Sequence, residues 1–339
     1  AFGASEVTLP YARDFMLYIL PGMFMTNFAF TFNNFMRVSG YPVKAMVTMF
    51  IGAGINVILA PIFIFYLGWG IKGAAIATDI SMTVSALFVM WHFFSRSSVL
   101  HFERDSWMYR PSWRVIFSII SIGAAPSLVN AAACFINVII NKSLYTYGGD
   151  IAVGAAGIFT SYTSLMTMVI VGMCQGMQPI IGYNYGAGML GRLKRTYWLA
   201  VAAATIIVTA GQIGGLAFPW YIARAFTSDA ELIDQTVRCL HISLLAFTVV
   251  GFQIISTTLF QSLGKASASI FLSLARQVIF LIPLLLFLPG RFGLNGVWMS
   301  FPISDLLATA VTVIMVSLQL SQLNRAVSGR NLCPESLDS

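Results

Sequence analysis

Residues 172–195 read GMCQGMQPIIGYNYGAGMLGRLKR, and this stretch decides how the rest of the chain is interpreted. It lies between two long apolar segments and ends in a basic cluster formed by Arg192, Lys194 and Arg195. A helix that faces lipid has no need of so many glycines and amides, whereas glycine and proline suit backbone that finds its partners inside protein or water. We expect a hinge or loop at the membrane border, in which the two glutamines anchor a bend, made of Gln175, Gln178, Pro179, Gly182, Asn184, Gly186 and Gly188. The plainer alternative is a helix end followed by a loop.

The composition places the chain in a membrane. Of its 339 residues, 58% are hydrophobic and 9% are charged, whereas about 25% of the residues of a soluble domain are charged. The net charge of +7 therefore indicates membrane topology, and nucleic-acid binding is not expected. The four cysteines and three histidines are scattered, so we expect neither disulfides, nor a metal site, nor a cofactor, nor an enzyme.

Apolar runs predict an all-α membrane protein. A membrane helix needs about 20 apolar residues, and nine segments satisfy this requirement. They lie near 15–36, 45–67, 73–95, 113–141, 151–173, 196–220, 238–262, 266–289 and 294–320.

The basic residues predict the orientation of these segments. If the N-terminal end lies outside, the inner loops carry about twice as many cations as the outer ones, as cytoplasmic loops do. The inner set is Arg37, Lys44, Arg96, Arg104, Arg110, Arg114, Arg192, Lys194, Arg195, Lys265, Arg325 and Arg330, and the outer set is Arg13, Lys72, Lys142, Arg224, Arg238 and Arg291. We expect a multi-pass protein of the cell (inner or plasma) membrane with its C-terminus in the cytoplasm.

An internal repeat predicts two lobes. Gly40 lies in a turn between two segments, and Gly264 lies in an equivalent turn 224 positions later. The same order of loop, helix, turn, helix, loop and helix spans six segments, which predicts a parallel repeat. Three further helices upstream would complete the first lobe. The expected organisation is 1–95 as the last three helices of an N-lobe, 96–112 as a cytoplasmic linker, 113–320 as a six-helix C-lobe, and 321–339 as a cytoplasmic tail.

Several blocks resemble the multidrug and toxic compound extrusion (MATE) family of efflux transporters. The most specific are QPIIGYNYGAG before a basic run and GWGIKGAAIATDIS at 68–81. Weaker matches are FNNFMRVSGYPVKAM at 32–46, NVILAPIFIF at 56–65, INKSLYTYGGD at 140–150 and LARQVIFLIPLLLFL at 274–288. The resemblance covers nearly the whole chain and implies helices four to twelve of a family member.

The resemblance implies a cation site in the N-lobe. The family's Asn matches Asn56 and its Thr matches Thr78, while the carboxylate expected one turn after the Asn falls on Ala60, which has none. Asp79 is the remaining acidic candidate, although neighbouring helix positions point about 100° apart. The alternatives are that Asn56 and Thr78 only bond within or between helices, and that Asp79 faces outer water.

Five further polar residues are candidates for lining a substrate cavity. Asn130, Asn137 and Asn141 fall near one helical face, while Arg276 and Asp305 are ionisable groups inside membrane segments, where such groups are costly. A structural ion pair between Arg276 and Asp305 is the alternative.

The resemblance implies secondary active efflux of small cationic amphipathic drugs, in exchange for sodium ions or protons, by alternating access of two lobes. The expected partners are the lipid bilayer and the drugs, and the protein is expected to be monomeric. Two alternatives stay open: a lipid-linked oligosaccharide flippase of the same superfamily, which should line its cavity with several cations, and a truncated membrane protein that transports nothing.

Overall fold

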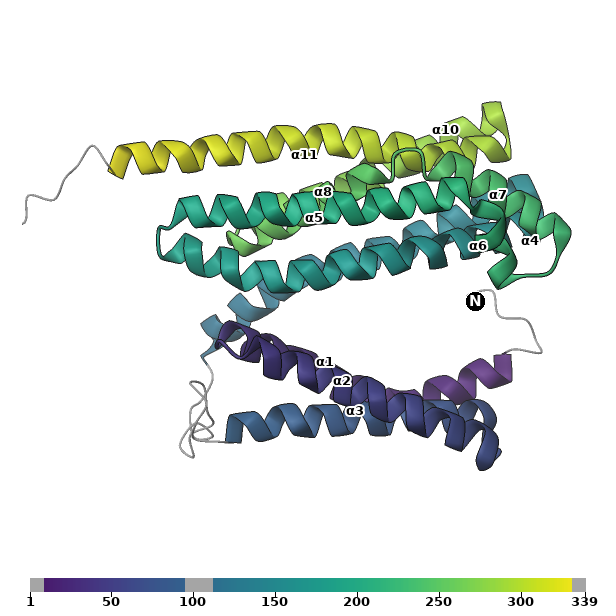
Figure 1. Ribbon diagram of the computed structural model, residues 1–339, viewed down its shortest axis with the longest axis horizontal. Helices are drawn as coiled ribbons and strands as arrows, with labels where there is room; N and C mark the ends of the chain where they lie inside the picture. Colours follow the sequence, from purple (N-terminus) through teal and green to yellow (C-terminus); the bar gives the residue numbers. More distant parts are fainter. Residues whose placement is uncertain (1–8, 95–111, 331–339) are drawn as a thin grey trace, which may run out of the picture. The chain divides into compact units, whose positions relative to one another are not determined.

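A computed structural model describes residues 9–94 and 112–330, and within these ranges every regular element is a helix (Figure 1). The all-α prediction is therefore confirmed. The chain divides into two compact units, residues 1–110 and 111–339. The predicted linker, apart from Ser112, and the predicted tail beyond Arg330 lie outside the described residues.

The first unit consists of three membrane-length helices. They are α1 (Leu9–Val38), α2 (Pro42–Pro61), which continues as the π-helical turn η1 (Ile62–Tyr66), and α3 (Gly70–Phe94). Pro42 opens α2, a position where the missing N–H costs no hydrogen bond. Helix α3 packs against both α1 and α2, so these three helices enclose the space between them.

The second unit begins with α4 (Trp113–Gly186), whose 74 residues cannot form one straight span. A straight helix of that length would measure about 110 Å, against a hydrocarbon core of about 30 Å. Gly149 breaks it with φ 63° and ψ −160°, and the chain turns back there (Figure 1). The two arms, 113–148 and 150–186, correspond to the fourth and fifth predicted segments.

The remaining elements of the second unit are shorter and more broken. They are α5 (Leu190–Ala217), α6 (Pro219–Phe226), α7 (Ala230–Ser243), α8 (Thr248–Ser262), α9 (Ala266–Leu274), the π-helix η3 (Ala275–Leu281), α10 (Ile282–Phe292) and α11 (Leu294–Arg330). Helix α11 ends at residue 330, so it continues past the predicted boundary near 320.

Among the described residues, seven helices are long and apolar enough to cross a membrane, or eight if the bent pair α7–α8, which meets at 61°, is one span. Helix α4 counts there as one span, Asn130–Gly186, and its two arms lie where the fourth and fifth segments were predicted. The chain is thus a multi-pass membrane protein.

The bend predicted around the two glutamines is absent, and the stretch is a helix end followed by a short turn, as the plainer alternative had it; its role as a hinge stays a prediction. Helix α4 stays helical through Gln175, Gln178, Pro179, Gly182 and Asn184, and ends at Gly186. Membrane helices tolerate proline because neighbouring groups satisfy the backbone that it frees. Only a short turn separates α4 from α5. In this turn Gly188 adopts φ 71°, a left-handed conformation that suits glycine.

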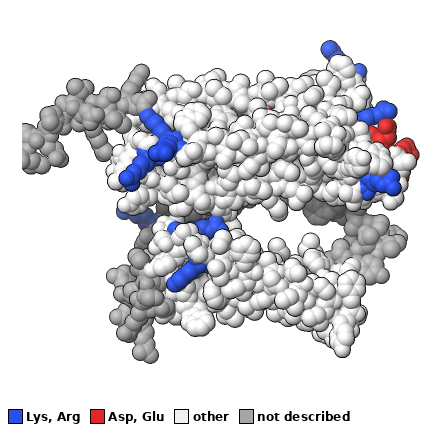
Figure 2. Space-filling model, viewed as in Figure 1, with Lys and Arg blue, Asp and Glu red and all other residues white. Residues whose placement is uncertain are grey.

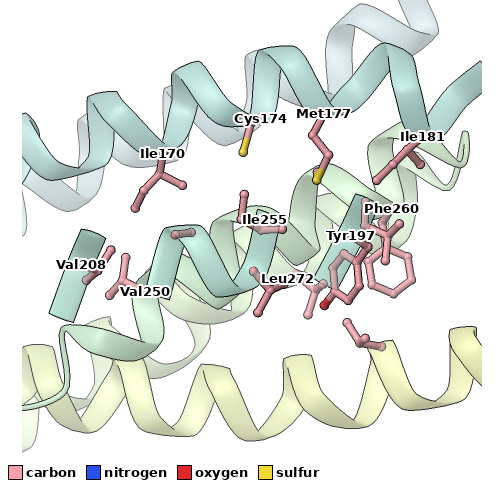
Figure 3. Packing of buried hydrophobic residues seen from close by; sticks show 14 of the residues in the cluster. Ile170, Cys174, Met177, Ile181, Tyr197, Val208, Val250, Ile255, Phe260 and Leu272 are labelled. Carbon is pink, nitrogen blue, oxygen red and sulfur yellow. The ribbon is translucent and has the colours of Figure 1, made fainter. Parts of the chain in front are cut away.

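Buried apolar side chains hold the second unit together. Figure 3 shows Ile170, Cys174, Met177 and Ile181 of α4 facing side chains of α5, α8 and α9, among them Tyr197, Ile255 and Leu272. Tyr197 has no exposed surface, and its hydroxyl lies 2.9 Å from Ser256 Oγ. This hydrogen bond satisfies both polar groups within the apolar core.

The internal repeat is visible in the backbone hydrogen bonds. The Gly40 and Tyr41 N–H groups donate to the Arg37 and Met36 carbonyls, at 3.3 and 2.9 Å. The Gly264 and Lys265 N–H groups donate to the Gln261 and Phe260 carbonyls, at 3.0 and 2.9 Å. Each of these residues lies 224 positions after its counterpart, and both glycines have positive φ, at 90° and 72°. The turn between α1 and α2 is therefore structurally equivalent to the turn between α8 and α9.

A close approach of backbones repeats in the same way. A Cβ added at Gly73 of α3 would lie 2.6 Å from the Phe63 carbonyl oxygen, and one at Gly296 of α11 would lie 2.5 Å from the Leu288 carbonyl oxygen. Both distances are below any real Cβ contact, so each position requires glycine. Helix α11 thus corresponds to α3, with an offset of 223.

Candidate functional site

A cavity of about 380 Å³ lies between α1, α2 and α3 of the first unit, and we call it the unit-1 cavity. Small residues, among them Ala29, Gly52 and Ala53, leave this space unfilled. Hydroxyl and amide side chains also line it, and none of its lining residues is charged. The full lining is Thr26, Ala29, Phe30, Asn33, Thr48, Met49, Gly52, Ala53, Asn56, Thr78, Ser81, Met82 and Ser85.

The structure brings Asn56 and Thr78 together on the wall of the unit-1 cavity. Asn56 Nδ2 donates to Thr78 Oγ1 at 3.1 Å, joining α2 to α3. The Thr78 hydroxyl donates in turn to the Ala74 carbonyl, at 2.8 Å, within its own helix. The Asn56 amide oxygen takes no part in this bond. The assignment of the amide oxygen and nitrogen rests on the hydrogen-bond network, and exchanging them would place two oxygens side by side.

Asp79 lies apart from this pair. Its carboxylate packs against Gly22 of α1, where an added Cβ would overlap it, and its Oδ1 is buried without a hydrogen-bond partner in the described part of the chain. Thr78 turns towards α2 while Asp79 turns towards α1, as the 100° between neighbouring helix positions requires. The three cation-site candidates therefore do not form one cluster, and the wall of the cavity offers neutral oxygens only.

Asn33 was missed by the sequence analysis, although it lies on the same cavity. It is 4% exposed, and its Nδ2 donates to the Ala45 carbonyl at 2.7 Å and to Thr48 Oγ1 at 2.6 Å. Its Oδ1 is buried with no partner among the described residues. A buried amide oxygen without a donor favours a ligand that supplies a positive charge or an N–H group.

Arg276 and Asp305 form an ion pair inside the second unit. Arg276 Nε donates to Asp305 Oδ1 at 2.7 Å, and the Asp305 side chain is 6% exposed while that of Arg276 is 33% exposed. The pair joins η3 to α11. Gln253 of α8, which the sequence analysis also missed, donates to the Asp305 carbonyl and to Thr309 Oγ1, both at 2.6 Å.

The other predicted site residues differ in exposure, and most of them lie on the surface of the second unit. Asn130, Asn137 and Asn141 are exposed on the first arm of α4, and Gln178 and Gly186 are exposed near the end of its second arm. Asn184 is buried and donates to the Ile180 carbonyl at 2.8 Å, a bond within its own helix.

Charged side chains gather at the ends of the second unit (Figure 2). The acids Asp229, Glu231 and Asp234 lie together at the start of α7, close to the basic residues there, and Asp234 pairs with Arg238 at 3.2 Å. Arg192, Lys194 and Arg195 lie in the first two turns of α5, after a span-length helix. This placement leaves the middle of each helix almost free of charge, as a membrane requires.

Three comparisons relate the chain to known proteins. A family model described as MatE matches residues 1–62 and 126–286. "Multidrug export protein MepA" of Staphylococcus aureus (strain MSSA476) is 26% identical over 317 residues, which cover 93% of this chain and 69% of that protein.

Solved structures resemble this chain at the same level of sequence identity. One is described as the outward-facing conformation of a multidrug resistance MATE family transporter of the MOP superfamily, with a TM-score of 0.86, 26% identity, and coverage of 95% of this chain and 72% of that one. A MOP superfamily transporter from Pyrococcus furiosus gives a TM-score of 0.87 with the same identity and coverage.

Proposed function

Since the chain belongs to the MatE family of multidrug efflux transporters, we propose that it exports cationic amphipathic compounds by antiport against sodium ions or protons. The family's members are transporters, not enzymes, and the seven or eight described spans suit that role. The observation that carries the proposal is the unit-1 cavity, where Asn56 and Thr78 are bonded to each other on the wall.

The chemistry of the unit-1 cavity supports a cationic guest. Amide and hydroxyl oxygens are hard ligands that suit sodium ions, and Asn56 and Thr78 supply two of them 3.1 Å apart after rotation of the amide. Asn33 adds a buried oxygen without a donor. The apolar lining, including Met49, Met82 and Phe30, suits the aromatic body of a drug, because methionine adapts to many shapes.

The site lacks a carboxylate on its wall. Ala60, at the position where the resemblance implies one, presents a methyl group, and Asp79 is turned towards α1. A sodium ion in a membrane needs compensating negative charge. We propose that Asp79 supplies this charge from the side of α3 that faces α1, either as a counter-ion to sodium or as the group that binds the proton.

The flippase alternative fits less well. A lipid pyrophosphate would need several cations around it, and no Lys or Arg lines the unit-1 cavity. The lack of basic side chains on the wall of this cavity therefore disfavours an anionic lipid.

We place the protein in the cell membrane as a monomer, with its C-terminus on the cytoplasmic side. This topology puts the basic start of α5 inside and the acidic start of α7 outside, as the positive-inside rule favours. Export would then follow alternating access of the two units.

The test is extrusion of ethidium from cells that express the full-length protein. We expect less accumulation than in cells with an empty vector, and a loss of this difference when the sodium and proton gradients are both collapsed. Accumulation equal to the empty-vector control, with the protein present in the membrane, would refute the proposal.

A further inference from the structure

The bent pair α7–α8 is interrupted at residues 244–247, and nothing in that stretch itself requires a break. It reads Leu-Leu-Ala-Phe, and leucine and alanine are among the best helix formers. By the offset of 224 between the matched turns, it corresponds to residues 20–23 of α1, which read Leu-Pro-Gly-Met. Proline and glycine weaken a helix, yet α1 runs through them without interruption. The cause of the break in the second unit therefore lies outside the broken stretch.

The side-chain amide of Gln212, on the neighbouring helix α5, is inserted into this break. Its Nε2 donates to the Leu245 carbonyl at 3.0 Å, and its Oε1 accepts from the Thr248 N–H at 3.0 Å. The Thr248 hydroxyl also donates to this oxygen. Backbone groups freed by a break in a membrane helix need partners within the protein. One amide group supplies a donor and an acceptor here, as a peptide group would.

These two bonds replace two bonds of a continuous helix. In an α-helix each N–H donates to the carbonyl four residues earlier, so the Thr248 N–H would donate to the Leu244 carbonyl. The Leu245 carbonyl would likewise accept from Val249, whose N–H instead donates to the Ala246 carbonyl, three residues earlier, at 3.3 Å. The broken form thus satisfies the same backbone groups as a continuous helix would, but it depends on Gln212 to do so.

Helix α5 presents Gln212 to the break from an anchored position. The Tyr162 hydroxyl of α4 donates to the Gly211 carbonyl at 2.6 Å, one residue before Gln212. A Cβ added at Gly215 would overlap Leu244 Cδ1, so a larger residue there would push the end of α7 away from α5. Small residues four positions apart, as Gly211 and Gly215 are, allow membrane helices to approach closely. This close approach keeps the Gln212 amide within reach of the break.

We propose that Gln212 is a positioning residue that holds α7 and α8 apart, and that residues 244–247 are a hinge that rejoins the two helices when this amide withdraws. The rejoined helix would satisfy its backbone internally, so the exchange trades two hydrogen bonds for two others. The part of the hinge in transport rests on the proposed function, because alternating access needs elements with two arrangements.

The distance between the outer ends of α7 and α8 reports the state of the hinge. Two arms of about 15 residues each, bent by 61°, hold the exposed positions Glu231 and Gln261 about 39 Å apart, against about 45 Å in a straight helix. Spin labels at these positions measure the distance by pulsed electron paramagnetic resonance. The protein is full length, with its accessible native cysteines replaced by serine.

Two leucine variants are compared. Gln212→Leu removes both bonds from the side-chain amide to the break. Gln253→Leu is the matched control, because it also removes two amide bonds between helices, from α8 to α11, but away from the break. The expected result is that the main distance lengthens by about 6 Å in Gln212→Leu and stays unchanged in Gln253→Leu.

Three outcomes would overturn the proposal. An unchanged distance in Gln212→Leu would mean that packing alone keeps the break, and a longer distance in both variants would mean that the second unit had loosened generally. If Gln212→Leu does not fold, Gln212→Asn takes its place, because its amide is one methylene shorter and cannot bond both groups. It should populate the longer distance, and an unchanged distance there also counts against the proposal. If neither variant folds, the proposal fails, because the rejoined helix should satisfy its backbone without Gln212.

A response to substrate separates a hinge from a fixed structural clamp. In the wild type, saturating ethidium should change the population of the longer distance at least about twofold, whereas the distances in Gln212→Leu should not respond. An unchanged distribution in a wild type that exports ethidium would overturn the hinge. If the wild type exports nothing, the proposed function fails, and the comparison of Gln212→Leu with Gln253→Leu still decides whether Gln212 holds the break.

Discussion

Replacing Gly22 by alanine should destabilise the protein through Asp79. A Cβ on Gly22 would overlap the Asp79 carboxylate and would lie 2.9 Å from the Asp79 Cα. Non-bonded carbon atoms prefer separations of about 3.5–4.0 Å, so a new side-chain rotamer alone cannot relieve the clash. Helices α1 and α3 must therefore separate locally.

The magnitude follows from two opposing terms. Overpacking of this kind costs about 1–3 kcal/mol, while glycine to alanine inside a helix gains up to about 1 kcal/mol from propensity. Gly54→Ala in α2 is the matched control, because an added Cβ there meets nothing within 4 Å. Gly54→Ala should be neutral or stabilising, and Gly22→Ala should be less stable than it by about 1–3 kcal/mol.

The assay is the apparent melting temperature of the purified full-length variants at one heating rate. Gly22→Ala should melt a few degrees below Gly54→Ala. In an Asp79→Ala background the cost of Gly22→Ala should shrink without vanishing, because the carboxylate is gone while the close Cα remains. Equal melting temperatures for the two glycine variants, or an undiminished cost in the Asp79→Ala background, would refute this account of Asp79.

Three further predictions follow from single contacts. Arg276→Met leaves the buried Asp305 carboxylate without its partner and should lower the free energy of unfolding by about 3–5 kcal/mol, whereas Arg238→Met breaks an exposed pair and should lower it by about 0–1 kcal/mol. Similar falls in the melting temperatures of the two variants would contradict this. Ala53→Leu should fill the unit-1 cavity and slow ethidium export at least about tenfold, a barrier of about 1.4 kcal/mol, with Gly54→Ala as the control that keeps wild-type export. Tyr197→Phe removes the hydrogen bond to Ser256 and should cost about 1 kcal/mol, seen as a small fall in melting temperature, and an unchanged value would show that the bond contributes nothing.

The membrane spans could be predicted because hydropathy is a local property. A run of about 20 apolar residues suits a bilayer whatever its neighbours are, so each predicted segment falls on helix in the structure, although the fourth and fifth are joined in α4. The opening stretch was misjudged for the opposite reason. Its glycines and Pro179 read as a break, yet α4 stays helical there and breaks at Gly149, because packing partners decide whether such residues bend a helix.

Some residues of the candidate site could be predicted from the sequence and others could not. Asn56 and Thr78 were selected by resemblance, and the packing of α2 on α3 brings them together although 22 residues separate them. Asn33 and Gln253 carry no comparable signal in the sequence. Their interest lies in one buried oxygen each that lacks a donor, and this appears only once three helices have packed around them.

The most direct test of the central claim is ethidium transport by the full-length protein in vesicles with an imposed sodium or proton gradient. We compare the wild type, the double variant Asn56→Leu/Thr78→Val, and the control Thr167→Val, whose hydroxyl bonds only carbonyls of its own helix among the described residues. The account predicts that the gradient-driven rate falls to the gradient-free level in the double variant alone. A double variant that transports as fast as the control, with equal amounts of folded protein, would contradict a coupling site at Asn56 and Thr78.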